Sequence, residues 1–111
     1  MIFITGPLWS GKRTAAKALL GCGDEELARR AVWDVQELAR ESIDIEELAK
    51  DLSRREVVIA TEIGGGVVPV ERAEREARER AGRLSCLLAA RADTVIRVFC
   101  GIPRIIKGDT E

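Results

Sequence analysis

The sequence predicts a three-layer α/β fold, in which a parallel sheet is covered by helices on both faces. Three short apolar runs rich in β-branched residues are predicted as buried strands: Met1–Thr5, Val57–Glu62 and Thr94–Cys100. Helix-forming stretches separate them, and strands that alternate with helices over short connections are typical of parallel sheets. With 111 residues, we expect a single domain over 1–111, reduced in size for an α/β enzyme.

The helices are predicted from apolar spacing and from residues that favour helix ends. The predicted ranges are 13–20, 24–30, 44–54 and 70–92. Asp44 and Glu47 have the spacing of a capping box. Ala31–Val35 fits either a short second strand or a helix that continues toward Arg40. The last predicted strand is closed by Gly101–Pro103 and followed by a short tail.

The first predicted strand leads directly into a GxxxxGK loop, and the loop leads into a helix. In that context the motif predicts phosphate binding, because glycines let backbone N–H groups surround phosphate oxygens at a helix N-terminus. Lys12 would reach the β- and γ-phosphates as a point charge. The alternative is a plain strand-to-helix turn. The candidate nucleotide-binding residues are Gly6, Pro7, Leu8, Trp9, Ser10, Gly11, Lys12, Arg13 and Thr14.

A second group of candidates follows the strand that ends near Glu62. Ligands of open parallel sheets collect at the carboxyl ends of the strands, where Glu62 would hold Mg²⁺ through water or orient an attacking group. Lys12 and Glu62 are therefore the predicted catalytic residues. Gly64 and Gly65 would let the backbone approach a substrate. The alternatives are a solvated carboxylate for Glu62 and a tight turn for the glycines.

Composition excludes several classes of function. The 18 basic and 19 acidic residues give a formal charge of -1, so we expect no nucleic-acid partner. The sequence has no histidine, which excludes His–Cys metal clusters, Ser–His–Asp triads and histidyl intermediates. The three cysteines are scattered and predicted to be reduced. No apolar run reaches the length of a membrane span, and we expect a cytoplasmic protein without a signal peptide.

Several separate motifs resemble those of one family. These are Gly6–Lys12, TEIGGGVVP at 61–69, a charged helix with Arg75, Arg78, Glu79 and Gly82, the Ala92-Asp93 pair, and GIPRIIKG at 101–108. In this order they resemble the adenosylcobinamide kinase/adenosylcobinamide-phosphate guanylyltransferase family. The resemblance assigns Arg75 and Arg78 as substrate or phosphate contacts, although charge runs on helices are mostly solvated faces.

The resemblance implies a P-loop NTPase fold of the RecA-like type and a homo-oligomeric enzyme of cobalamin assembly. It also implies that ATP or GTP phosphorylates the aminopropanol hydroxyl of adenosylcobinamide, a corrinoid. The family's second activity, GMP transfer, uses a guanylylated histidine that this sequence cannot supply. Arg13 replaces the usual Mg²⁺-binding Ser or Thr, for which Thr14 or Thr5 would substitute. The alternative function is a nucleotide- or corrinoid-binding module without catalysis.

Overall fold

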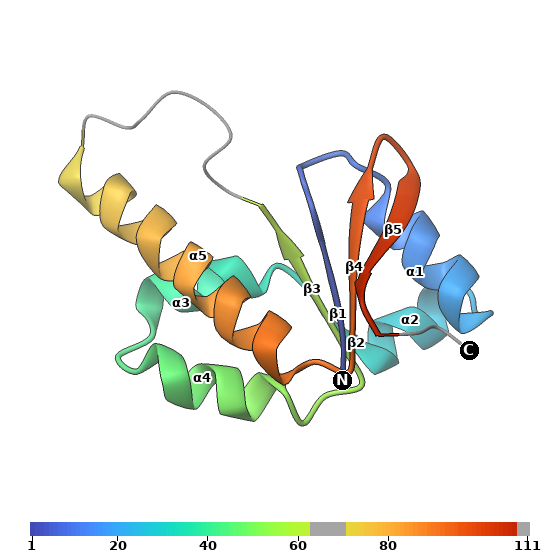
Figure 1. Ribbon diagram of the computed structural model, residues 1–111, viewed down its shortest axis with the longest axis horizontal. Coiled ribbons are helices and arrows are strands. Elements are labelled where there is room, and N and C mark those ends of the chain that lie inside the picture. Colours follow the sequence, from blue (N-terminus) through green and yellow to red (C-terminus); the bar gives the residue numbers. More distant parts are fainter. Residues whose placement is uncertain (63–70, 109–111) are drawn as a thin grey trace.

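A computed structural model describes residues 1–62 and 71–108, and its centre is a five-stranded sheet of order β2-β3-β1-β4-β5. The strands are β1 Ile2–Gly6, β2 Ala31–Val32, β3 Val57–Thr61, β4 Thr94–Phe99 and β5 Ile102–Lys107. β1 pairs in parallel with both β3 and β4, and β2 pairs in parallel with β3. The strand that precedes the loop therefore lies at the centre of the sheet, next to the strand that precedes Glu62 (Figure 1).

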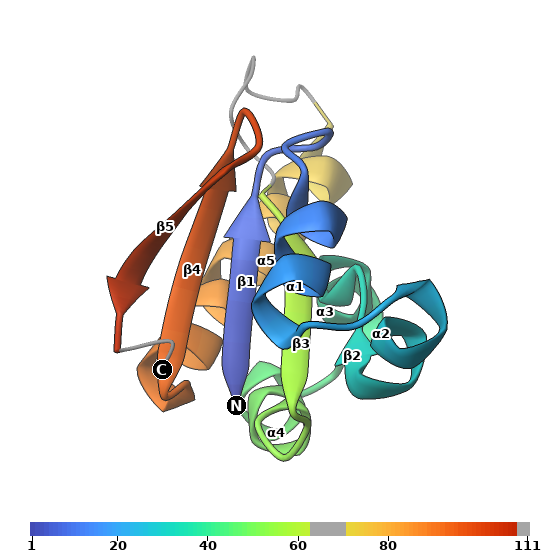
Figure 2. The same ribbon diagram turned by 90° about the vertical axis from the view of Figure 1, so that its right-hand side faces the viewer.

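Helices lie on both sides of the sheet, which confirms the predicted α/β fold with flanking helices. α1 and α2 lie on one side, and α3, α4 and α5 lie on the other (Figures 1 and 2). Their bounds are α1 Lys12–Leu20, α2 Asp24–Arg30, α3 Val35–Glu41, α4 Ile45–Leu52 and α5 Arg72–Arg91. The predicted N-cap at Asp44 is also confirmed, because its carboxylate accepts a hydrogen bond from the Glu47 amide at 3.1 Å.

The core has two parts because successive strand residues point to opposite faces of the sheet. On the α3–α5 side, Phe3 and Val58 pack in one buried cluster with Leu84 and Leu88 of α5. On the α1–α2 side, Ile4, Ile59 and Val98 pack in another with Ala16 and Leu27. Apolar residues at consecutive strand positions are thus buried on both faces, as expected for strands that helices cover on both sides.

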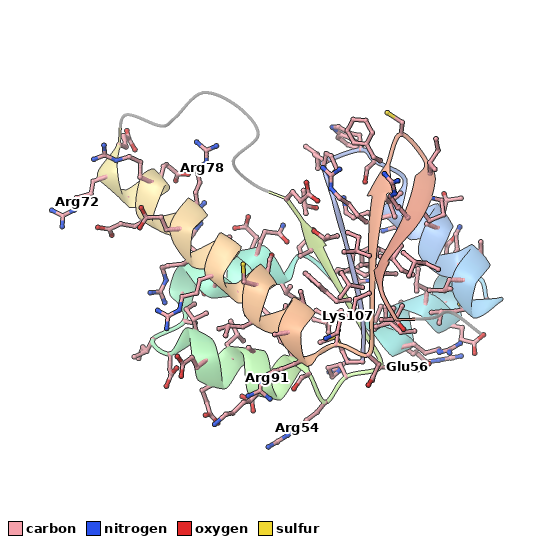
Figure 3. All side chains as sticks on the ribbon, viewed as in Figure 1. Arg54, Glu56, Arg72, Arg78, Arg91 and Lys107 are labelled. Atoms are coloured by element: carbon pink, nitrogen blue, oxygen red, sulfur yellow. The ribbon has the colours of Figure 1, made fainter. Side chains whose placement is uncertain are left out.

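The prediction of a fully parallel sheet is wrong at one edge. The segment predicted as a tail forms β5, which pairs antiparallel with β4. Cys100 and Gly101 connect the two strands with positive φ angles of 53° and 76°, as a two-residue hairpin turn requires. β5 contains Pro103, which is tolerated because the strand lies at the edge of the sheet. Lys107 then fastens β5 to the end of α5 by donating to the Ala89 and Ala90 carbonyls (Figure 3).

The segment with two possible readings begins as a strand. Ala31–Val32 is a strand, so a helix does not continue through this segment, and a separate helix, α3, begins at Val35 and covers the stretch toward Arg40. The residue at the junction is Asp34, whose φ of 51° ends the extended chain before the helix. This places the Asp34 carboxylate beyond the carboxyl end of a parallel strand.

Candidate functional site

The loop between β1 and α1 encloses the ammonium group of Lys12. Lys12 is only 9% exposed. Its Nζ donates to the carbonyl oxygens of Gly6 at 3.3 Å and Pro7 at 2.7 Å, and to Ser10 Oγ at 3.5 Å. These partners hold a positive charge on the inner side of the loop, at the position the motif predicts for phosphate recognition.

The amino end of α1 adds unpaired donors to the same place. The first N–H groups of a helix have no partner within the helix, and they carry the positive end of the helix dipole. At α1 the N-cap residue is Gly11, with φ 91°, which has no side chain to cap the helix. The first turn also contains no acidic residue. The helix end is therefore open to an anion rather than satisfied by the chain itself.

The hairpin between β4 and β5 supports the loop from behind. The Gly101 amide donates to the Ser10 carbonyl at 2.7 Å. A methyl group at Gly6 would overlap the Val98 carbonyl oxygen, and one at Gly11 would lie 3.1 Å from the Gly101 Cα. Two of the motif glycines are thus required by close backbone contact with β4 and the hairpin turn.

Arg13 and Thr14 point to different surroundings. The Arg13 guanidinium lies over the Trp33 ring, 5.2 Å from its centroid. Thr14 lines an apolar groove between α1 and β5. The residue at the usual metal-binding position is thus directed toward an aromatic ring, and its side chain has no acceptor atom to offer a cation. Trp9, within the loop, is 91% exposed and has a positive φ of 62°.

Glu62 lies beside the loop and is paired with an arginine that the sequence did not single out. The Glu62 amide donates to the Gly6 carbonyl at 2.8 Å. Arg97 of β4 donates to both carboxylate oxygens, from Nε at 2.7 Å and from a terminal nitrogen at 2.8 Å. These hydrogen bonds lower the pKa of Glu62. Glu62 is therefore an ionised, oriented carboxylate and a weak proton acceptor.

Asp34 and Gln36 are two further site residues that sequence reasoning missed. Gln36 accepts from the Thr61 amide at 2.9 Å and donates to Asp34 at 3.4 Å. Both line a cavity of about 400 Å³ with Glu62. Burial lowers the pKa of Lys12, whereas the charges of Asp34 and Glu62 act to raise it. Asp34 was placed inside the possible strand Ala31–Val35, whereas the structure ends β2 at Val32 and leaves Asp34 beyond the carboxyl end of the strand. No sequence signal indicated which residues would surround it.

The long helix α5 places two small residues at the site, and its two predicted phosphate contacts, Arg75 and Arg78, stay predictions. Gly82 and Ser85 line a cavity of about 210 Å³ together with Thr5, Thr61 and Glu62. Arg75 is exposed near the amino end of α5. Arg78 extends from α5 toward the end of the molecule where the parallel strands terminate (Figure 3). Gly64 and Gly65 lie outside the described residues.

Two of the predicted Mg²⁺ donors, Thr14 and Glu62, do not meet. Thr14 faces the groove beside β5, whereas Glu62 faces the cavities on the β3 side of the loop. Within 1–62 and 71–108, no group of three or more Cys, Asp or Glu side chains could hold a metal ion. Mg²⁺ is commonly held by one or two carboxylates together with substrate phosphates. Glu62 and Asp34, which share a cavity next to Lys12, fit that donor set better than Thr14.

The Glu62–Arg97 pair makes stability depend on pH. A carboxylate whose pKa is lowered by folding stabilises the protein above the ordinary carboxyl range, and this contribution is lost as the pH falls through its lowered pKa. We expect Glu62→Gln to unfold at lower urea concentration than the parent at pH 7. The difference should shrink below about pH 4. Urea titrations at several pH values measure it, and a difference independent of pH would contradict the pairing.

Comparison with known proteins gives one family. Residues 22–106 match the family model described as cobinamide kinase / cobinamide phosphate guanyltransferase. The matched range begins after the GxxxxGK loop and contains Asp34, Glu62 and Arg97. No curated protein matches the chain. In the part of the chain that the structure describes, no helix combines the length and apolar character needed to cross a membrane.

Proposed function

The chain belongs to the cobinamide kinase / cobinamide phosphate guanyltransferase family, which acts in cobalamin biosynthesis, and we propose that it phosphorylates adenosylcobinamide with ATP or GTP. The observation that carries the proposal is the enclosed Lys12 ammonium at the uncapped start of α1, next to the oriented Glu62 carboxylate. The family match and the loop come from different parts of the chain, so they support the proposal independently.

The reaction asks for positioning and charge stabilisation rather than covalent catalysis. The aminopropanol hydroxyl oxygen forms a bond to the γ-phosphorus, the bond from that phosphorus to the leaving nucleoside diphosphate breaks, and the hydroxyl proton passes to water. Lys12 and the loop amides would hold the triphosphate and offset its growing charge. Glu62 would orient the hydroxyl or a Mg²⁺-bound water. Its lowered pKa makes it a poor general base.

The proposal covers only the kinase half of the family's chemistry. The sequence contains no histidine, so a guanylylated histidine cannot form and no GMP transfer by that route is proposed. A cytoplasmic location and a homo-oligomer are part of the proposal. Exposed Ile102 and Ile106, on one face of β5, support the oligomer, because exposed apolar patches mark association surfaces.

A second candidate function is nucleotide or corrinoid binding without catalysis. Arg13 favours it, since its guanidinium stacks on Trp33 where other loops of this type supply a metal-binding hydroxyl. Such a module would bind nucleotide with the same affinity in the presence and absence of Mg²⁺, and it would not consume the nucleotide.

Nucleotide consumption separates the two functions. We expect ATP or GTP turnover to require adenosylcobinamide and to fall about 10²-fold in Glu62→Gln, the scale expected when an oriented catalytic group is lost. The matched control is Glu56→Gln, because Glu56 is also paired with an arginine, Arg30, and lies just before β3, at the strand's other end. Nucleotide binding without turnover in the parent protein would favour the second function, and an equal loss of turnover in both variants would refute a specific role for Glu62.

A further inference from the structure

An apolar groove begins at the phosphate loop and runs between α1 and β5. Its volume is about 430 Å³, within the range of small-molecule sites. Ala18 of α1 and Ile105 of β5 form opposite walls, and Ile96 of β4 lies in the floor. The lining residues Ile4 of β1 and Ile96 of β4 place the groove over these two strands. No residue of the groove belongs to the cavities that contain Glu62.

The groove is continuous with the loop through two residues. Thr14 lies in the first turn of α1, directly after Lys12 and Arg13, and it lines the groove. Gly101 also lines the groove, and its amide is bonded to Ser10 in the loop. A molecule whose phosphates occupy the loop therefore lies next to this groove. The Arg13 side chain, by contrast, lies over the Trp33 ring and does not line the groove.

We propose that the groove between α1 and β5 binds the nucleoside part of the triphosphate, an inference that rests on the proposed function. A nucleoside is flat and largely apolar on its faces and is joined to the anion that the loop attracts. The exposed side chains Pro103 and Ile105 offer apolar contact area to such a ring. The groove thus supplies apolar contact area for the nucleoside, whereas the loop supplies the contacts to the phosphates.

The same lining predicts weak discrimination between bases. Among the lining residues that the structure describes, Thr14 alone has a polar side chain. A site discriminates strongly between two bases when its buried polar groups form hydrogen bonds with one base and are left unpaired by the other. Apolar contacts distinguish two bases only weakly. We therefore expect the dissociation constants for ATP and GTP to agree within about fivefold.

The test compares nucleotides with inorganic tripolyphosphate, which engages only the loop. Ala18 is exposed, so Ala18→Leu narrows the groove without entering the core. We expect this variant to bind ATP and GTP about tenfold more weakly and tripolyphosphate with unchanged affinity. Ile105→Ser, which removes the apolar wall on β5, should act in the same direction if Ala18→Leu fails to fold. Ala73→Leu, an exposed change on α5, is the matched control.

The possible outcomes distinguish the two proposals. The groove proposal would be overturned if tripolyphosphate bound as tightly as ATP, or if the groove variants bound nucleotides normally. Either result would leave the proposed role of the loop in place. A strong preference for one base would also overturn the groove proposal. Failure of the parent protein to bind tripolyphosphate and nucleotides alike would instead remove the loop's proposed role, and the groove proposal with it.

Discussion

Lys12→Ala is expected to lower phosphoryl transfer by about 10²- to 10³-fold and to weaken nucleotide binding by about 10- to 100-fold. The ammonium group lies inside the loop and donates to the Gly6 and Pro7 carbonyls. Removing it takes away the charge that would face the β- and γ-phosphates and the side chain that shapes the loop. Turnover and nucleotide titration, measured on the same preparation, give the two effects separately.

Lys17→Ala is the matched control for this change. Lys17 lies on the same helix, and its ammonium forms an ion pair with Asp24 at 3.2 Å, away from the loop. The control removes an equal charge from α1, so a general electrostatic effect would appear in both variants. Equal losses would refute a specific role for Lys12, as would normal turnover in Lys12→Ala.

Gly6→Ala is expected to destabilise the fold by about 3 kcal/mol, at the upper end of the usual cost of overpacking. The added methyl group would overlap the Val98 carbonyl oxygen in the neighbouring strand and crowd Ser10 Oγ at 2.8 Å. Either β1 and β4 separate or the loop shifts, so phosphate binding should weaken as well. Urea unfolding monitored by circular dichroism measures the loss.

The control for this change is Gly23→Ala. A methyl group at Gly23 meets no atom within 4 Å, and its φ of -97° suits any residue. We expect a change of a few tenths of a kcal/mol from the altered N-cap. If Gly6→Ala unfolded at the same urea concentration as Gly23→Ala, the close contact between the loop strand and β4 would be refuted.

The features that the sequence predicted well are local. Two of them are the GxxxxGK loop, which follows one apolar run, and the Glu62 carboxylate, which ends another apolar run. Each is defined within a few residues. The structure places Gly6 and Glu62 side by side. The apolar strands and the long helix follow from periodicity that needs no knowledge of neighbours. These parts of the fold therefore could be predicted from one sequence.

The features that the sequence missed depend on strand order. Arg97 faces Glu62 because β4 and β3 flank the same central strand, at a separation of 35 residues in the chain. Asp34 and Gln36 join them only because β2 lies beside β3. No periodicity encodes such neighbours. β5 was missed for a local reason, since Cys100 takes a positive φ that is uncommon for a residue with a side chain.

The arginine after the loop lysine has a structural partner. Arg13 stacks on Trp33, so its replacement of a hydroxyl residue is tied to the packing of α1 against the segment after β2. Among the described residues, the cavity on the other side of the loop from Thr14 is lined by the carboxylates Asp34, Glu37 and Glu62. The site proposed for phosphoryl transfer is therefore built between β2, β3 and the loop.

The most direct measurement follows the label from a nucleotide carrying a labelled γ-phosphate, incubated with the protein, Mg²⁺ and adenosylcobinamide. We predict that the label appears on adenosylcobinamide as a phosphate ester of its aminopropanol hydroxyl, and that Lys12→Ala abolishes the transfer while Lys17→Ala does not. Label that stays on the nucleotide or passes only to water, with the protein folded and nucleotide bound, would contradict the proposed phosphotransferase.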